Sequence, residues 1–102
     1  MCIVVDAGHG GDDPGKIGIN DALEKDINLQ IALKLQKLLE QNNIKVVMTR
    51  DTDQGLYSDG ATNKKAEDMQ TRCKIIEDSD ALFTVSIHQN SYTSPEIQGA
   101  QV

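Results

Sequence analysis

Residues 4–15 read VVDAGHGGDDPG, an apolar strand pattern that runs directly into a glycine-rich turn. The run CIVVD at 2–6 is typical of a strand that is buried on both faces. The turn after it contains His9, and the chain of 102 residues has only two histidines. A scarce histidine at the end of a buried strand is a candidate functional residue, and its surroundings depend on the segments that follow.

The segment after this turn predicts a helix and then a second strand. Residues 21–43 carry apolar side chains on one helical face, and Asn42–Asn43 form a plausible stop. The apolar positions of this face are Ile27, Ile31, Leu35, Leu38 and Leu39. The run IKVVMT at 44–49 predicts a strand, and the polar, turn-rich residues 51–63 predict a surface loop.

A second helix and a third strand complete the pattern. Ala66, Met69, Cys73 and Ile76 recur at spacings of three and four, which predicts an amphipathic helix to about residue 77. We expect Met69 and Cys73 to pack on the buried face of this helix. The run ALFTVSIH at 81–88 predicts a strand, and a polar loop and the residues GAQV follow it.

The order strand–helix–strand–helix–strand predicts an α/β fold with a mostly parallel sheet flanked by helices. In such sheets, ligands bind beyond the carboxyl ends of the strands. His9 follows the first predicted strand, and His88 ends the third. Both histidines are therefore expected at the same rim of the sheet, which is the first sign of a functional site.

Length and composition fit one small globular domain with 38% hydrophobic and 25% charged residues. The formal net charge is −6 and Lys64–Lys65 is the only adjacent basic pair, which argues against a nucleic-acid partner. No run approaches the roughly 20 apolar residues of a membrane span. No targeting segment is visible, so an exported protein would need one outside this sequence. Cys2 and Cys73 lack the spacing of a metal-binding pair.

Three interpretations of the glycine-rich turn are open. A phosphate site is disfavoured, because the turn lacks a nucleotide-binding spacing and carries Asp12 and Asp13 where phosphates would lie. A purely structural turn needs no function, since glycine permits positive φ and Pro14 stiffens the loop. A zinc site is favoured by the second histidine, because catalytic zinc takes three protein ligands and a water.

The third metal ligand would be a carboxylate near the start of the first predicted helix. Glu24 is the candidate, and Asp21, Asp26, Asp12 and Asp13 are its competitors. In the sequence DALE, however, Asp21 could be the helix N-cap and Glu24 its capping-box partner. The local pattern supports ligation and capping about equally.

Four segments together resemble a known family. VVDAGHGGDDPG, LEKDINLQIALKL, VMTRDTD and VSIHQNS, in this order and rough spacing, are similar to zinc-dependent N-acetylmuramoyl-L-alanine amidases of the Amidase_3 family. Residues 57–72 and 87–102 look most like the CwlD-type sporulation branch, which prepares muramic-δ-lactam in the spore cortex. The resemblance implies a peptidoglycan hydrolase that cleaves the amide between N-acetylmuramic acid and the L-alanine of the stem peptide.

The resemblance also implies roles for particular residues. The zinc ligands of the family fall on His9, Glu24 and His88, which favours ligation over capping for Glu24. The family has a general-base glutamate in a motif near the C-terminus of its domain, and we expect that residue to lie beyond Val102. The chain at 1–102 is then the N-terminal portion of an amidase catalytic domain, and we expect this portion alone to be inactive.

Position suggests further roles. Asn90 follows a ligand and Arg50 follows the second strand, so both could contact substrate. Arg50 could instead pair with a neighbouring aspartate at the surface. Asp6 or Asp12 could accept a hydrogen bond from the free ring nitrogen of a ligand histidine.

The family resemblance bears on partners and location as well. A sheet without the remaining strands of the domain would expose an apolar edge, which invites a dimer, a strand swap or an activating protein partner. Action on peptidoglycan places the protein outside the cytoplasm, in the cell envelope. Two alternatives stay open, namely another zinc peptidase of carboxypeptidase-like fold and a non-catalytic zinc or wall-binding module.

Overall fold

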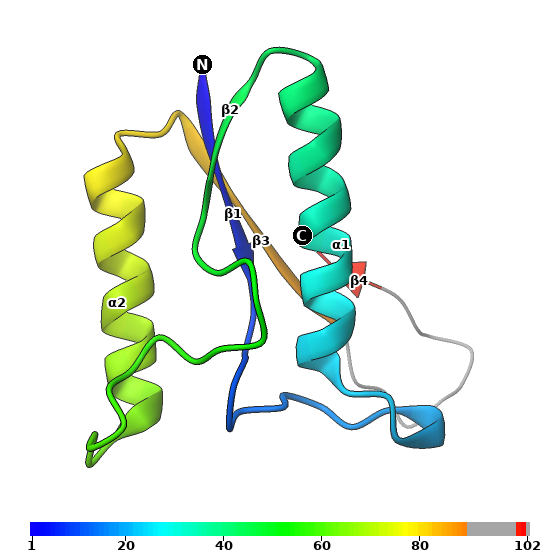
Figure 1. Ribbon diagram of the computed structural model, residues 1–102, viewed down its shortest axis with the longest axis vertical. Helices are drawn as coiled ribbons and strands as arrows, with labels where there is room; N and C mark the ends of the chain where they lie inside the picture. Colours follow the sequence, from blue (N-terminus) through cyan, green and yellow to red (C-terminus); the bar gives the residue numbers. More distant parts are fainter. Residues whose placement is uncertain (90–99, 102) are drawn as a thin grey trace.

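The computed structural model of the chain describes residues 1–89 and 100–101 (Figure 1). The predicted elements are present in the predicted order, and a short 3-10 helix and a fourth strand are added. The bounds are β1 Cys2–Ala7, η1 Ile19–Asp21, α1 Glu24–Gln41, β2 Lys45–Met48, α2 Lys64–Ser79, β3 Phe83–Gln89 and β4 Ala100–Gln101.

The strands form one sheet with the order β2-β1-β3-β4. β1 pairs in parallel with both neighbours, so that Val4 lies between Val47 and Thr84. β4 pairs antiparallel with the end of β3, at His88 and Gln89. The α/β fold with a mostly parallel sheet is confirmed. The sequence does not predict β4, because the run GAQV is too short for an alternating pattern.

The two helices cover opposite faces of the sheet, with α1 on the right and α2 on the left of the strands in Figure 1. Alternate residues of a strand face opposite sides. Ile3, Val5 and Ala7 of β1 pack with Ala32 of α1 in the main apolar core. Asp6 faces the other way and contacts α2. β1 therefore presents an apolar face to α1 and a carboxylate to α2.

Charged side chains attach α2 to the sheet. The buried residues of this helix are Asp68 and Arg72. Met69 is 60% exposed and Cys73 is exposed, so the prediction that both pack on a buried face is wrong. The reason lies in β1, where Asp6 offers a buried carboxylate to Arg72. A desolvated guanidinium needs such a partner, and this need orients the helix.

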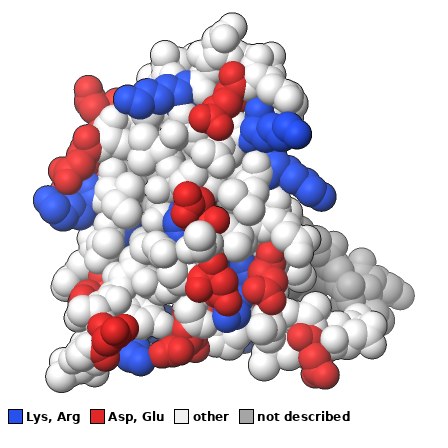
Figure 2. All heavy atoms as spheres, in the orientation of Figure 1, with Lys and Arg blue, Asp and Glu red and all other residues white. Residues whose placement is uncertain are grey.

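The outer edge of β3 is only partly covered within the described residues. Positions 83–87 pair with β1 alone, and Phe83 is half exposed. No helix in the described part of the chain is long and apolar enough to cross a membrane. On the face shown in Figure 2, the Lys and Arg side chains lie in separate places among Asp and Glu.

Candidate metal centre

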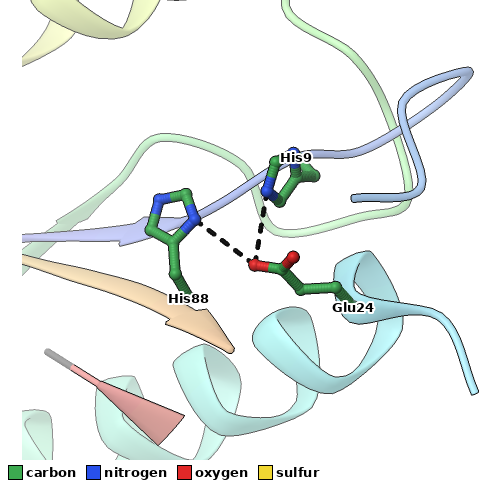
Figure 3. Close-up of side chains that lie close together, drawn as sticks. All are labelled: His9, Glu24 and His88. Atoms are coloured by element: carbon green, nitrogen blue, oxygen red, sulfur yellow. Dashed lines mark ion pairs between the residues drawn. The ribbon is translucent and has the colours of Figure 1, made fainter. Parts of the chain in front are cut away.

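Three side chains from distant parts of the chain meet at the carboxyl-end rim of β1 and β3. His9 follows β1, Glu24 is the first residue of α1, and His88 lies near the end of β3 (Figure 3). His9 Nε2 and His88 Nδ1 each lie 3.3 Å from Oε2 of Glu24. One ligand atom from each residue lies within 4.8 Å of the other two. The two histidines thus share one rim, as the topology predicts.

Two of the three separations among these atoms match those in a tetrahedral zinc site. Zinc lies about 2.0–2.1 Å from an imidazole nitrogen or a carboxylate oxygen, so two of its ligands are about 3.3 Å apart. That is the separation between the Glu24 oxygen and each histidine nitrogen. The residues present could therefore hold a zinc ion with three protein ligands.

Glu24 is a buried carboxylate with three hydrogen-bond donors around it. It is 4% exposed. Oε1 accepts from the backbone N–H of Lys16, and Oε2 accepts from the backbone N–H of Gln89 and the side-chain amide of Asn28. Burial alone would raise the pKa of Glu24, but these hydrogen bonds and the nearby His9 lower it. Glu24 is therefore ionised at neutral pH, which is the state that a metal ligand needs.

The capping interpretation of Glu24 is wrong. α1 begins at Glu24 itself, and its N-cap is Leu23, which makes no side-chain capping hydrogen bond. Asp21 lies outside the helix, in η1. The Glu24 side chain turns towards the histidines instead, while its charge still lies in the first turn, where the helix dipole favours an anion.

His9 has an uncommon backbone and a fixed ring. Its φ is 65°, in the left-handed region that non-glycine residues rarely adopt. His9 Nδ1 lies 2.8 Å from Oδ2 of Asp13. An Nδ1–H donated to this carboxylate leaves Nε2 unprotonated and directed at Glu24. Burial would raise the pKa of Asp13, but hydrogen bonds from His9 and from the backbone N–H of Gly15 lower it.

Two glycines make room for the ligands. Gly8 lies under the ring of His88, and a Cβ at Gly8 would lie 2.7 Å from His88 Nδ1. Gly15 has φ 69°, and a Cβ there would lie 2.7 Å from both a His9 ring carbon and Oε1 of Glu24. His88 is the most exposed of the three, at 48%, and its ring lies edge-on to that of His9 with centroids 5.1 Å apart.

The other acidic candidates lie elsewhere. Asp21 and Asp26 are exposed, and Asp12 pairs with a lysine of α2. The expectation that Asp6 or Asp12 binds a histidine ring is wrong, because Asp13 does so. The turn folds back through paired backbone hydrogen bonds between residues 10 and 13, which carries the Asp13 side chain to the ring.

Arg50 is buried, and its contacts fit neither of the two roles expected for it. It is 2% exposed. Its guanidinium donates to the backbone carbonyl oxygens of Ala7, Gly8, Lys25 and Thr52 at 2.9–3.0 Å. Arg50 thus ties the end of β1 to α1, and neither a contact with substrate nor a surface pair with aspartate fits this placement.

A cavity of about 500 Å³ opens beside the two histidines, between α2 and the sheet. Its wall includes the apolar side chains of Met69 and Ile76. The cavity gives the candidate metal centre an open side, large enough for part of a peptide or sugar. Asn90, the other residue expected to contact substrate, lies outside the described residues.

Two residues of the site have only faint signals in the sequence. Asn28 follows Glu24 by four positions on the same face of α1 and donates to it, a spacing that could have indicated the contact. Arg72 donates to the carbonyl oxygen of His9. Arg72 follows Asp68 by the same spacing of four. Exposed ion pairs on helices have this spacing too, so the sequence does not show that the Asp68–Arg72 pair is buried.

The chain has a parallel sheet flanked by helices and a His–Glu–His cluster at the carboxyl ends of the strands. These features place it in the class of α/β proteins with a candidate catalytic metal centre. The family follows from comparison with known proteins. The chain belongs to the Amidase_3 family of N-acetylmuramoyl-L-alanine amidases, whose family model matches residues 3–102. The family resemblance of the four sequence segments is confirmed.

Named relatives support this membership. The germination-specific N-acetylmuramoyl-L-alanine amidase of Bacillus subtilis (strain 168) is 39% identical over 102 residues, covering 97% of this chain and 43% of the relative. The amidase AmiC of Escherichia coli O6:H1 is 37% identical over 103 residues, covering 100% of this chain and 22% of the relative.

Solved structures agree. The CwlD amidase from Clostridioides difficile, solved in complex with the GerS lipoprotein, has a TM-score of 0.88 at 40% identity. That match covers 94% of this chain and 51% of the CwlD chain. The amidase AmiC2 of Nostoc punctiforme has a TM-score of 0.76 at 36% identity, over 92% of this chain and 46% of that chain. The chain therefore spans about half the length of these solved relatives.

Proposed function

We propose that the protein is a zinc-dependent N-acetylmuramoyl-L-alanine amidase that acts on peptidoglycan. The bond cleaved is the amide between the lactyl group of N-acetylmuramic acid and the L-alanine of the stem peptide. The observation that carries the proposal is the cluster of His9, Glu24 and His88, with two ligand separations of 3.3 Å at the mouth of a cavity. Family membership adds the reaction type.

The residues of the cluster have distinct tasks in this proposal. His9 Nε2, His88 Nδ1 and a Glu24 oxygen would hold the zinc ion, which when bound polarises the scissile carbonyl and activates a water. Asp13 keeps the proton on His9 Nδ1. The three donors around Glu24 keep its carboxylate oriented. The cavity between α2 and the sheet would receive the stem peptide on the open side of the centre.

A general base is also required, and the family supplies it from a glutamate near the C-terminus of its domain. We infer that residues 1–102 are the N-terminal portion of the amidase domain and that the base lies beyond Val102. The Bacillus and Escherichia relatives are longer than this chain, and the match covers 43% of one and 22% of the other. On this view the 102 residues bind zinc but do not turn over substrate.

The biological setting belongs to the same proposal. The Bacillus relative is named germination-specific, and the Clostridioides relative is a CwlD amidase. These names support action in the cell envelope, outside the cytoplasm, and a role in spore cortex maturation. The CwlD amidase was solved with a lipoprotein. A protein partner or a second copy could pair with the outer edge of β3, at positions 83–87.

Digestion of purified peptidoglycan by the complete encoded protein tests the function. An amidase releases intact stem peptides with a free L-alanine amine and leaves the glycan strands whole. We expect this product from the wild type with bound zinc, and loss of it from His9→Ala and Glu24→Gln. Asp26→Asn is the matched control, since it removes an exposed carboxylate from the same helical turn.

The products also separate the alternatives. A free amine on any other residue would indicate a peptidase of another specificity. Binding to peptidoglycan without any new amine would indicate a non-catalytic wall-binding module. Wild-type protein that holds no zinc after equilibration at neutral pH would contradict the proposal outright.

A further inference from the structure

A side chain of α2 holds the backbone of His9. Arg72 Nη2 donates to the carbonyl oxygen of His9, and Nη1 donates to that of Ala7, each at 2.7 Å. β1 ends at Ala7, so the carbonyl of His9 lies beyond the ladder of the sheet. The guanidinium therefore supplies a donor where the neighbouring strand no longer does.

Arg72 is itself fixed on two sides. Nη1 pairs with Asp6 of β1 at 2.6 Å, and Nε pairs with Asp68 one turn earlier in α2. Asp6 accepts further hydrogen bonds from the hydroxyl groups of Thr49 and Ser86, each at 2.7 Å. Arg72 is 6% exposed, so these partners are screened from water. A guanidinium held in this way is planar, so its N–H donors point in fixed directions. The ammonium group of a lysine has no such fixed arrangement of donors.

His9 needs such support because of its backbone. At φ 65° the backbone of His9 lies in the left-handed region, which is unfavourable for a residue with a Cβ. A non-glycine residue keeps this conformation only when surrounding contacts enforce it. Arg50 supports the preceding carbonyls, those of Ala7 and Gly8, at 3.0 Å. Three successive carbonyls thus accept from guanidinium groups, and Arg72 is the one that reaches His9 itself.

We propose that Arg72 is a positioning residue of the candidate metal centre. Its guanidinium holds His9 in the left-handed conformation that directs Nε2 at Glu24, and so links the position of α2 to the geometry of the ligands. The inference rests on the proposed function, because it takes His9 as a metal ligand. Within the described residues, Arg72 acts through the His9 backbone and makes no hydrogen bond to Glu24 or to the His88 ring.

Zinc affinity and ligand geometry test the proposal in the complete encoded protein. Arg72→Lys keeps the charge and removes the fork, and Lys74→Gln changes an exposed cation on the same helix. We expect Arg72→Lys to weaken zinc binding by about 10–100-fold in a competition with a chromophoric chelator. We also expect it to shift the visible absorption of the cobalt(II) form. Lys74→Gln should match the wild type in both measurements.

A residue that supports only the fold would behave differently. It would lower the melting temperature but leave zinc affinity and the cobalt(II) spectrum unchanged in protein kept well below that temperature. That result for Arg72→Lys would overturn the proposal. Should Arg72→Lys fail to fold, Asp68→Asn takes its place, because it loosens Arg72 and touches no ligand. Wild-type zinc affinity and spectrum in Asp68→Asn would overturn the proposal equally.

A second measurement needs no metal. A positive φ shortens the distance between the amide and α protons of one residue, so the intraresidue nuclear Overhauser effect of His9 reports its backbone. We expect the metal-free wild type to show the strong effect and Arg72→Lys to lose it. This outcome in a protein that binds no zinc would support the positioning role and refute the zinc function. An unchanged effect in Arg72→Lys would refute the positioning role alone.

Discussion

At the scale of single residues, each candidate ligand is kept in place by a different means. The ring of His9 is fixed by Asp13, and the carboxylate of Glu24 is fixed mainly by backbone N–H groups. His88 depends on the space above Gly8. Substitutions of the residues that support the ligands should therefore weaken zinc binding, although all three ligand residues are still present.

Gly8→Ala tests the space under His88. The added methyl group would lie 2.7 Å from His88 Nδ1, so the ring must leave its present position beside Glu24. We expect zinc affinity to fall about tenfold or more, and overpacking to cost about 1–3 kcal/mol in the free energy of unfolding. Calorimetric zinc titration and urea unfolding measure the two effects.

Gly60→Ala is the matched control for this glycine, because nothing lies within 4 Å of a Cβ at Gly60. Its zinc affinity should equal that of the wild type. If Gly8→Ala and Gly60→Ala bind zinc equally well, His88 does not need the space that Gly8 leaves.

Asp13→Asn tests the support of the His9 ring. The amide that replaces the carboxylate is a weaker acceptor for Nδ1–H and adds no charge to the imidazole, so Nε2 becomes a poorer ligand. We expect zinc affinity to fall about 10–100-fold in a competition titration. Asp12→Asn, in the same turn but exposed, is the control. Equal losses in both variants would point to net charge and not to the ring.

At the scale of the element, periodicity predicts where segments form better than which face they bury. Ile31 and Leu35 of α1 recur on one face, and they pack against the core as expected. Met69 has the same kind of spacing in α2 but remains exposed. The helix turns Arg72 inward to meet Asp6, which lies 66 positions away. No local pattern contains a partner at that distance.

From the sequence, only those parts of the site that follow from the sheet topology can be predicted. The carboxyl ends of parallel strands share a rim, and this rule alone predicts that His9 and His88 lie together. Capping and ligation ask for the same residue type at the start of α1, so only the family resemblance favours ligation for Glu24. The pairing of Asp13 with His9 depends on the path of the turn backbone. The sequence offers Asp6, Asp12 and Asp13 near His9 and does not show which of them reaches the ring.

The attachment of α2 should be sensitive to acid. Burial would raise the pKa of Asp6, but hydrogen bonds from Ser86 and Thr49 and the charge of Arg72 hold it below the usual 3.8. A carboxyl whose folded pKa is depressed adds stability above its unfolded pKa and loses it as pH falls through the folded value. The contribution of Asp6 is therefore complete well above pH 3.8, declines as the pH falls below 3.8, and is lost once the pH has passed the lower pKa of the folded state.

Asp6→Asn isolates this contribution. Removing one partner of a buried ion pair costs about 3–5 kcal/mol, so we expect a loss of this size at pH 7 in urea unfolding. The difference from the wild type should shrink as the pH is lowered through the folded pKa of Asp6. Asp51→Asn, an exposed change in the following loop, should follow the wild type at every pH. A difference that stays constant with pH would contradict the assignment.

At the scale of the whole molecule, a bound metal should stabilise the folded chain as a unit. Only the folded state brings His9, Glu24 and His88 together, so zinc that binds it shifts unfolding by mass action. At free zinc about 100 times its dissociation constant, the gain is about 2.7 kcal/mol. For a chain of 102 residues this raises the melting temperature by about 10–20 °C.

Differential scanning calorimetry with zinc and with a chelator measures this shift. The chelator should lower the melting temperature of the wild type and leave that of His88→Ala unchanged. Identical transitions of the wild type under both conditions would show that the cluster holds no metal in the folded state.

The origin of the three ligands also fixes when in folding a metal can be captured. His9 and His88 stand 79 positions apart, with both long helices between them. In a zinc finger the ligands close short loops, and the ion can nucleate the fold. Here β3 must first dock beside β1, and the entropy of closing that long loop is lost before the last imidazole arrives. We therefore expect a metal that this cluster holds to bind late in folding, after β3 has paired with β1.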